Sequence, residues 1–194
     1  MAAVRPTTRP VSLPGHSAPL AGLEAPFEML AACHERVERM LALQARLQAH
    51  LQDKGCDAPA RQAARDVMRY FDLAAPLHHQ DEELHVFPPL QAGPDAGLRA
   101  LVERLLQDHR QMEAAWVPAR RTLQTVADSP DSAGPAPLAP EAAQALQRFA
   151  ALYRRHLDDE DGLAYPAAQA ALAPAAVQAM SLDMMQRRGV VPKS

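Results

Sequence analysis

The chain has 194 residues, 48% of them apolar, and a formal net charge of −3. Its acidic and basic residues are interspersed along the sequence. This length suffices for one domain with a sizeable core, and the balanced charge argues against a nucleic-acid-binding or membrane-binding surface. Because no apolar run approaches the roughly 20 residues of a membrane span, the first residues lack the apolar centre of a secretory signal, and the two cysteines show no disulfide spacing, we expect a cytoplasmic protein.

Alanine and leucine dominate the apolar residues, and aromatic residues make up only 4% of the chain, so the composition predicts an all-α fold. Residues 1–24 hold four prolines among small residues, which is typical of a flexible, disordered arm. Pro26 then suits the first position of a helix, and Gly55 suits its end. The apolar seam of this first helix has the spacing of a bundle helix and includes one histidine: Phe27, Leu30, His34, Val37 and Leu41.

A second helix is predicted from about residue 59 to Pro88, with a kink at Pro76. His78 and Glu82 share its apolar track, whereas the neighbouring track through His79 and Glu83 passes Asp72 and is expected to face water. We therefore predict that His78 and Glu82 point into the bundle. By the same argument His79 and His85 lie on the outer face or only hydrogen-bond to a ligand, and the remaining acidic residues form a solvated face: Asp81, Glu83, Asp158 and Asp159.

The third helix follows the turn at residues 91–97, and the fourth spans about residues 141–164. Each again has one histidine on its apolar stripe, with Glu113 one turn after the first of them and Glu160 one turn after the second. The stripes are Leu98, Val102, Leu105, His109, Met112 and Trp116 on the third helix, and Leu146, Phe149, Tyr153, His156, Glu160 and Leu163 on the fourth. A last, short helix is predicted around residues 174–188.

Short connections between long helices imply antiparallel neighbours, so the predicted architecture is an up-down-up-down four-helix bundle with an extra C-terminal helix. We divide the chain into an arm at residues 1–24, the bundle at residues 25–168, and a C-terminal helix and tail at residues 169–194.

A repeated motif, His-x3-Glu-x5-Pro, ends the second and fourth helices, as His78, Glu82 and Pro88 and as His156, Glu160 and Pro166. A histidine and a glutamate four residues apart point the same way from a helix, and imidazole with carboxylate is a ligand set for first-row metals. One histidine on an apolar face is more often a hydrogen-bonded core residue than a ligand. Four histidines and two glutamates converging in one core are costly to bury without a cation, so a metal site is favoured over a metal-free polar network.

With these histidines and the doubled motif, the chain resembles the hemerythrin-like (HHE cation-binding) domain over about residues 24–166. The resemblance implies a non-haem di-iron centre in an antiparallel four-helix bundle. Its metal ions would be two irons that an oxo or hydroxo group can bridge, with manganese or zinc less favoured. The ligands that it implies are the histidines His34, His78, His109 and His156 and the bridging carboxylates Glu82 and Glu160, with Glu113 as a further candidate.

Oxygen-carrying hemerythrins have a second histidine where this sequence has Glu113, so the resemblance disfavours simple oxygen carriage. We expect a di-iron protein that binds or senses O2, NO or redox state, or that handles iron. The rival hypothesis is a di-iron enzyme, meaning an oxidase, a peroxidase acting on peroxide, or an NO-linked iron-repair protein. A weaker alternative is a structural metal bundle that serves as an interaction module. The sequence identifies neither the ligand nor a protein partner.

Overall fold

The computed structural model describes residues 25–190, and all regular secondary structure in this range is helical. The predicted all-α class is therefore confirmed, whereas the predicted arm at residues 1–24 lies outside the described residues. The elements are α1 (Pro26–Asp53), α2 (Ala58–Arg69), η2 (Tyr70–Ala74), α3 (Ala75–Asp81), η3 (Glu82–Val86), α4 (Phe87–Ala92), α5 (Ala96–Asp128), α6 (Pro140–Ala151), α7 (Tyr153–Asp159), η4 (Glu160–Ala164), α8 (Tyr165–Ala171) and α9 (Pro174–Arg187).

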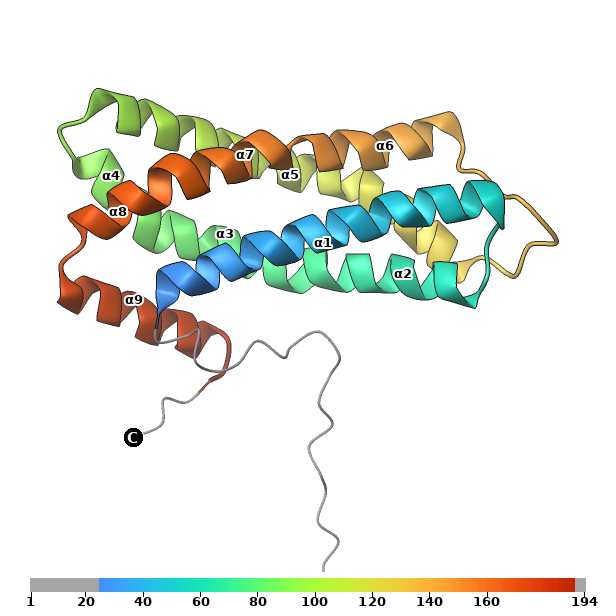
Figure 1. Cartoon of the computed structure of the whole chain (residues 1–194), viewed down its shortest axis with the longest axis horizontal. Helices are drawn as coiled ribbons and strands as arrows, with labels where there is room; N and C mark the ends of the chain where they lie inside the picture. The colour runs from blue at the N-terminus through green and yellow to red at the C-terminus, as the bar shows by residue number, and fades with distance from the viewer. Residues whose placement is uncertain (1–24, 191–194) are drawn as a thin grey trace, which may run out of the picture.

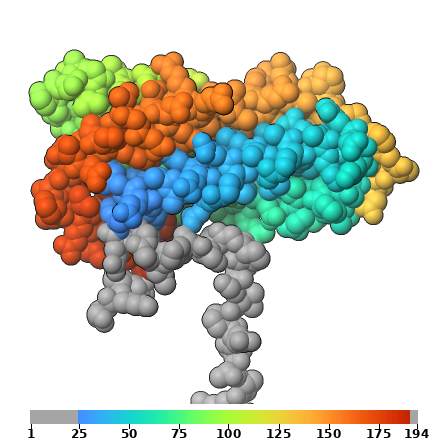
Figure 2. Space-filling model, in the orientation of Figure 1, coloured from blue at the N-terminus to red at the C-terminus, as the bar shows by residue number. Residues whose placement is uncertain are grey.

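The helices form four columns that lie side by side in Figure 1: α1, the run from α2 to α4, α5, and the run from α6 to α8. The α2 helix packs against both α1 and α5, and α5 also packs against α6. Figure 2 shows α1 next to the α6–α8 column on one face, with α9 beside the beginning of α1. Among the described residues, no helix is both long enough and apolar enough to cross a membrane.

Apolar residues fill the space between the columns in two clusters. One cluster contains Val37, Phe71 and Met112, and the other contains Leu30 and Leu105. Along α1 and α5 the buried histidine comes between a member of one cluster and a member of the other. The polar residues that form the site described below therefore lie in the middle of the bundle, with apolar packing on both sides of them.

Three π-helical turns, η2, η3 and η4, interrupt the second and fourth columns. In each case a proline stands two residues after the turn: Pro76, Pro88 and Pro166. Within an α-helix a proline ring collides with the carbonyl group four residues earlier and removes one hydrogen bond. A π turn bonds to the carbonyl five residues earlier, as Phe87 does to Glu82, and this wider turn accommodates the proline. The prediction that Pro88 ends its helix is therefore wrong, because α4 continues to Ala92.

The π turns also change which residues face the core. Each turn holds one more residue than an α-helical turn, so the apolar stripe shifts by one position after it. Leu163, which we predicted to lie on the buried stripe, is 52% exposed, and Ala164 is buried in its place. Leu84 is likewise 51% exposed within η3 while Val86 is buried.

Candidate metal centre

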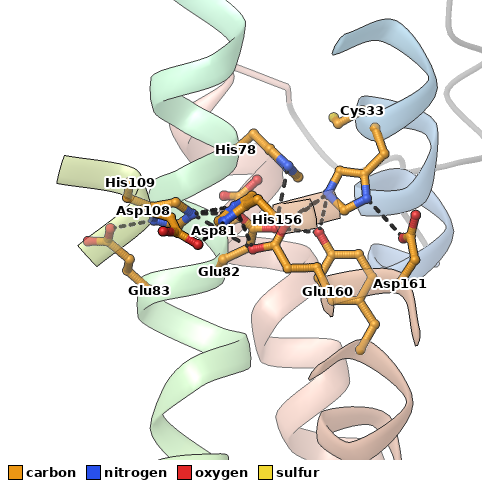
Figure 3. Close-up of polar contacts among 12 residues, drawn as sticks. Cys33, His78, Asp81, Glu82, Glu83, Asp108, His109, His156, Glu160 and Asp161 are labelled. Carbon is orange, nitrogen blue, oxygen red and sulfur yellow. Dashed lines mark hydrogen bonds and ion pairs between the residues drawn. The ribbon is translucent and has the colours of Figure 1, made fainter. Parts of the chain in front are cut away.

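Four imidazoles and two carboxylates converge in the middle of the bundle (Figure 3). They come from all four columns, and none of the six side chains is more than 4% exposed. They are His34 on α1, His78 on α3, Glu82 on η3, His109 on α5, His156 on α7 and Glu160 on η4. The structure thus brings together six of the seven predicted ligands.

The potential ligand atoms form two groups, each with its atoms within 4.8 Å of one another. The first group comprises His34, His78, Glu82 and Glu160. The second comprises His79, His109 and His156. Each group by itself could hold a metal ion.

Each of the two carboxylates faces both groups. The Oε1 atom of Glu82 lies 3.4 Å from Nε2 of His78, and its Oε2 atom lies 3.6 Å from Nε2 of His109. The Oε2 atom of Glu160 lies 3.3 Å from Nε2 of His34, and its Oε1 atom lies 3.1 Å from Nε2 of His156. Glu82 and Glu160 are therefore placed to bridge two cations.

Carboxylates at the edge of the site orient the imidazoles. The Nδ1 atom of His34 is 2.9 Å from Asp161 Oδ1, and the Nδ1 atom of His109 is 2.8 Å from Glu83 Oε1. A carboxylate that accepts the Nδ1 proton leaves the Nε2 lone pair free for a metal. Both Nε2 atoms point to the centre of the site, as a metal ligand requires. Glu83, which we expected only to face water, thus also contacts a ligand candidate.

Residues 25–168 match the Hemerythrin HHE cation binding domain. The chain belongs to this family. An uncharacterized protein from Haemophilus influenzae is 34% identical over 92 residues, which are 47% of this chain and 52% of that protein. The chain therefore spans about half the length of this curated relative. Membership in the HHE family supports cation binding as the role of the histidine and glutamate cluster.

His79 lies inside this HHE centre, which the sequence did not predict. Its ring stacks on that of His109, with centroids 4.0 Å apart and planes 11° apart, and it belongs to the second group of ligand atoms. The expectation that its track faces water is wrong, because His109 of α5 stacks on His79 and leaves it only partly exposed. The adjacent pair His78 and His79 was the available signal in the sequence. The sequence of one helix, however, cannot show which other helix packs against His79.

Glu113 lies in neither group of ligand atoms, and its side chain is exposed. The structure therefore does not bring Glu113, the seventh predicted ligand, to the other six. Glu113 and His109 are both on α5, but the ring of His109 turns toward His156, whose Nε2 atom is 3.2 Å from its own. Besides His109 and His156, the second group therefore contains His79 of α3 and no second residue of α5.

Tyr165 is a site residue that the sequence analysis missed. Its hydroxyl donates a hydrogen bond to Glu82 Oε1 and lies 2.8 Å from Nε2 of His34, and its ring stacks on the His34 ring. The residue immediately precedes Pro166, and Phe87 holds the equivalent place before Pro88 in the first motif. The two copies of the motif thus differ at the residue before the proline, and this difference was the available signal for a hydroxyl group at the site.

Burial and mutual contact shift the proton affinities of the cluster in opposite directions. Burial alone would lower the pKa of His34, but Glu160 and Glu82 raise it to about 10. The same balance, with Glu160 and Glu83 as partners, raises the pKa of His109 to about 9. Burial would raise the pKa of Glu160, but His109, His156 and His34 lower it well below its usual range. In the metal-free chain, protons on imidazoles thus take the place of cations beside the carboxylates.

Several buried polar atoms of the cluster have no hydrogen-bond partner in the described part of the chain. They are both ring nitrogens of His78, Nδ1 of His156, Oε2 of Glu82 and both carboxylate oxygens of Glu160. Buried polar atoms are nearly always paired, and a cation between the two groups would pair most of these. The donor set of imidazole and carboxylate also matches iron, manganese or zinc. The residues present therefore fit a pair of first-row metal ions.

Asp81 is buried beside this centre, although we expected it on a solvated face. Its carboxylate is 0% exposed and pairs with Nη2 of Arg187 at 2.6 Å and with Nη2 of Arg188 at 2.5 Å. Arg187 is the last residue of α9 and Arg188 follows it, so the end of this helix lies over the end of α3 and covers Asp81. The expectation failed because it considered α3 without the helix that packs on it.

Proposed function

We propose that this HHE-family chain is an antiparallel up-down-up-down bundle that binds two iron ions and uses them to bind or sense O2, NO or redox state, or to handle iron. The observation that carries the proposal is the pair of buried carboxylates, Glu82 and Glu160, each of which faces both groups of ligand atoms. When bound, a pair of irons would supply sites that accept small oxygen- or nitrogen-containing ligands such as O2, NO or peroxide.

The residues of the chain have separate tasks in this proposal. His34 and His78 would hold the first iron, and His79, His109 and His156 would hold the second. The second group supplies three nitrogens, so the lack of a histidine at position 113 no longer argues against oxygen carriage. Reversible oxygen binding therefore remains within the proposal.

The apolar clusters on both sides keep bulk water away from the first group of ligand atoms, whose residues are all buried. The hydroxyl of Tyr165 holds a proton between Glu82 and His34. The hydroxyl can donate this proton to Glu82 as long as Glu82 Oε1 keeps a lone pair that no cation occupies. The chain thus excludes water from the first group and sets the position of the nearest proton.

A di-iron enzyme, either an oxidase, a peroxidase or an NO-linked iron-repair protein, is the second candidate function. A pocket that reaches His79 and His109 from the surface favours it, because a substrate larger than a diatomic gas can approach the second group. Multiple turnover with peroxide or NO would support the enzyme, and stoichiometric, reversible ligand binding would support the sensor.

The deciding experiment is elemental analysis of the full chain expressed with iron, combined with absorption spectra of the anaerobically reduced and the air-exposed protein. We expect about two irons per chain, by analogy with dinuclear carboxylate bundles, and a spectrum that changes on exposure to air. One tightly held zinc per chain and no spectral response would contradict the proposal and favour a structural metal bundle.

A further inference from the structure

A pocket of about 590 Å3 runs from the surface between α3 and α5 to the second histidine group. Its outer lining includes the exposed side chains of Arg110 and Glu113, and its inner lining includes His79 and His109. Pockets that enclose small organic ligands have volumes of about 300–1,000 Å3. The pocket is thus far larger than a diatomic gas requires.

The inner wall is aromatic. Trp116 lies with its ring centroid 5.2 Å from that of Phe71 and 4.8 Å from that of Phe149, and Tyr153 lies 5.7 Å from Phe71. All four rings line the pocket. Their tilted and edge-on packing presents both ring faces and ring edges, which suits a further aromatic ring inserted among them.

One polar group stands at the inner end of the pocket without a partner. Within the described residues, His79 forms no hydrogen bond or ion pair, and its ring contacts are with the imidazoles of His78, His109 and His156. An imidazole nitrogen that faces a pocket can accept a hydrogen bond from a hydroxyl group. The inner end therefore selects a ligand that has one polar atom at the tip of an apolar body.

The charged groups at the mouth offer no free cation to an anionic ligand. Two carboxylates, Glu83 and Glu113, line the pocket together with a single guanidinium, that of Arg110. The Nη2 atom of Arg110 already donates to Gln107 at 2.8 Å. Glu83 is itself paired with Nδ1 of His109 at 2.8 Å. An acidic ligand would thus find no unpaired cation at the mouth of the pocket.

We propose that this pocket binds a neutral, single-ring aromatic alcohol, with its ring against Trp116 and Phe71 and its hydroxyl oxygen at His79. The ring position depends on the pocket alone. The position of the oxygen rests on the proposed function as well, because an iron held by His79 and His109 would take an oxygen donor at the same point.

Trp116 is the only tryptophan in the sequence, so its fluorescence reports directly on the pocket. Phenol is titrated into the full chain after chelation of metals, with cyclohexanol and benzoate as comparison probes. We expect saturable quenching by phenol, and at least about tenfold weaker responses to the saturated ring and to the anion. Quenching that rises linearly without saturation, or equally for all three probes, would overturn the proposal.

A pair of variants on α5 tests the position of the ring. Leu106 lines the pocket, whereas Leu98 does not, and both are partly buried against the same apolar cluster. Leu106→Phe should fill the pocket and weaken phenol binding about tenfold, while Leu98→Phe should leave it unchanged. If circular dichroism shows that Leu106→Phe is unfolded, Glu113→Phe at the exposed mouth takes its place. Equal binding by the filled variant and its control would refute the pocket assignment.

The cobalt-loaded full chain tests the position of the oxygen. With 4-fluorophenol as the probe, the fluorine resonance should broaden in the cobalt-loaded chain and lose this broadening in Leu106→Phe. A chain that binds two metals but shows no saturable phenol quenching would refute the pocket proposal alone. Phenol quenching in a chain that binds no metal would refute the proposed function and leave the aromatic pocket in place.

Discussion

At the scale of single residues, the centre uses two neighbouring histidines on one helix. Successive residues of an α-helix point about 100° apart, so His78 and His79 are directed to different neighbours. His78 lies beside His34, with ring centroids 4.9 Å apart, and His79 lies on His109. We therefore infer that these two residues serve different metal positions.

The first prediction concerns these two histidines. His78→Ala and His79→Ala should each lower the metal content by about one ion per chain, because each removes a nitrogen from a different group. His85→Ala is the matched control, since His85 pairs with Asp183 at 2.7 Å, away from the ligand groups. Elemental analysis of the three variants tests this. Full metal content in His79→Ala would show that His79 lies near the site without binding a metal.

The second prediction concerns the carboxylates. Glu160→Gln should lose most of both metals, because both of its oxygens face ligand imidazoles in the 0% exposed centre. Glu113→Gln should retain them, because its exposed side chain belongs to neither group. Metal-to-protein ratios after dialysis measure the difference. Loss of metal from both variants would return Glu113 to the ligand set.

At the scale of secondary-structure elements, α9 is joined to the centre through one buried carboxylate. Met180 and Met184 pack into an apolar cluster of the bundle, and the arginines that follow them pair with Asp81, which immediately precedes Glu82. This helix therefore helps to hold the turn that carries Glu82.

The third prediction tests this support. Replacing both Arg187 and Arg188 by alanine leaves the buried carboxylate of Asp81 unpaired, which should lower the free energy of unfolding by about 3–5 kcal/mol. Arg154→Ala is the control, because Arg154 is exposed and forms no ion pair within residues 25–190. Urea unfolding of metal-loaded protein provides the measurement. Equal stability of the double variant and the control would mean that Asp81 gains another partner.

At the scale of the whole molecule, the metal-free bundle depends on protons within its core. The pKa of His34 is about 10 and that of His109 about 9 in the folded chain, above the ordinary value of 6.5. A raised folded pKa adds stability that is complete below pH 6.5 and is lost as the pH rises through the folded values. Glu160 behaves in the opposite way, because its lowered pKa adds stability that is lost in acid.

The fourth prediction follows from this balance. The free energy of unfolding of the metal-free chain should fall as the pH rises from 6.5 toward 10, as His34 and His109 lose their protons. The metal-loaded chain should change less, since bound cations already hold these imidazoles without protons, so the stabilisation by metal should grow with pH. Urea unfolding with and without a chelator measures both curves. A metal-free stability that rises over this range would contradict the proton balance.

The spacing of apolar residues determined most of the bundle. The helical class and the burial of His34, His109 and His156 follow from apolar residues spaced three and four apart. Residues at this spacing lie on one face of any α-helix. The same local rule placed Glu82 one turn after His78, and the structure brings both into one group of ligand atoms.

Tertiary structure decided the rest, because the remaining choices depend on contacts between columns. The π turn at η4 exposes Leu163 and directs Tyr165 to His34, and no local period anticipates a turn with one added residue. The third imidazole of the second group is His79, since α5 lies across that face of α3 while Glu113 points to solvent. A helix sequence specifies its own faces, but only packing specifies what each face meets.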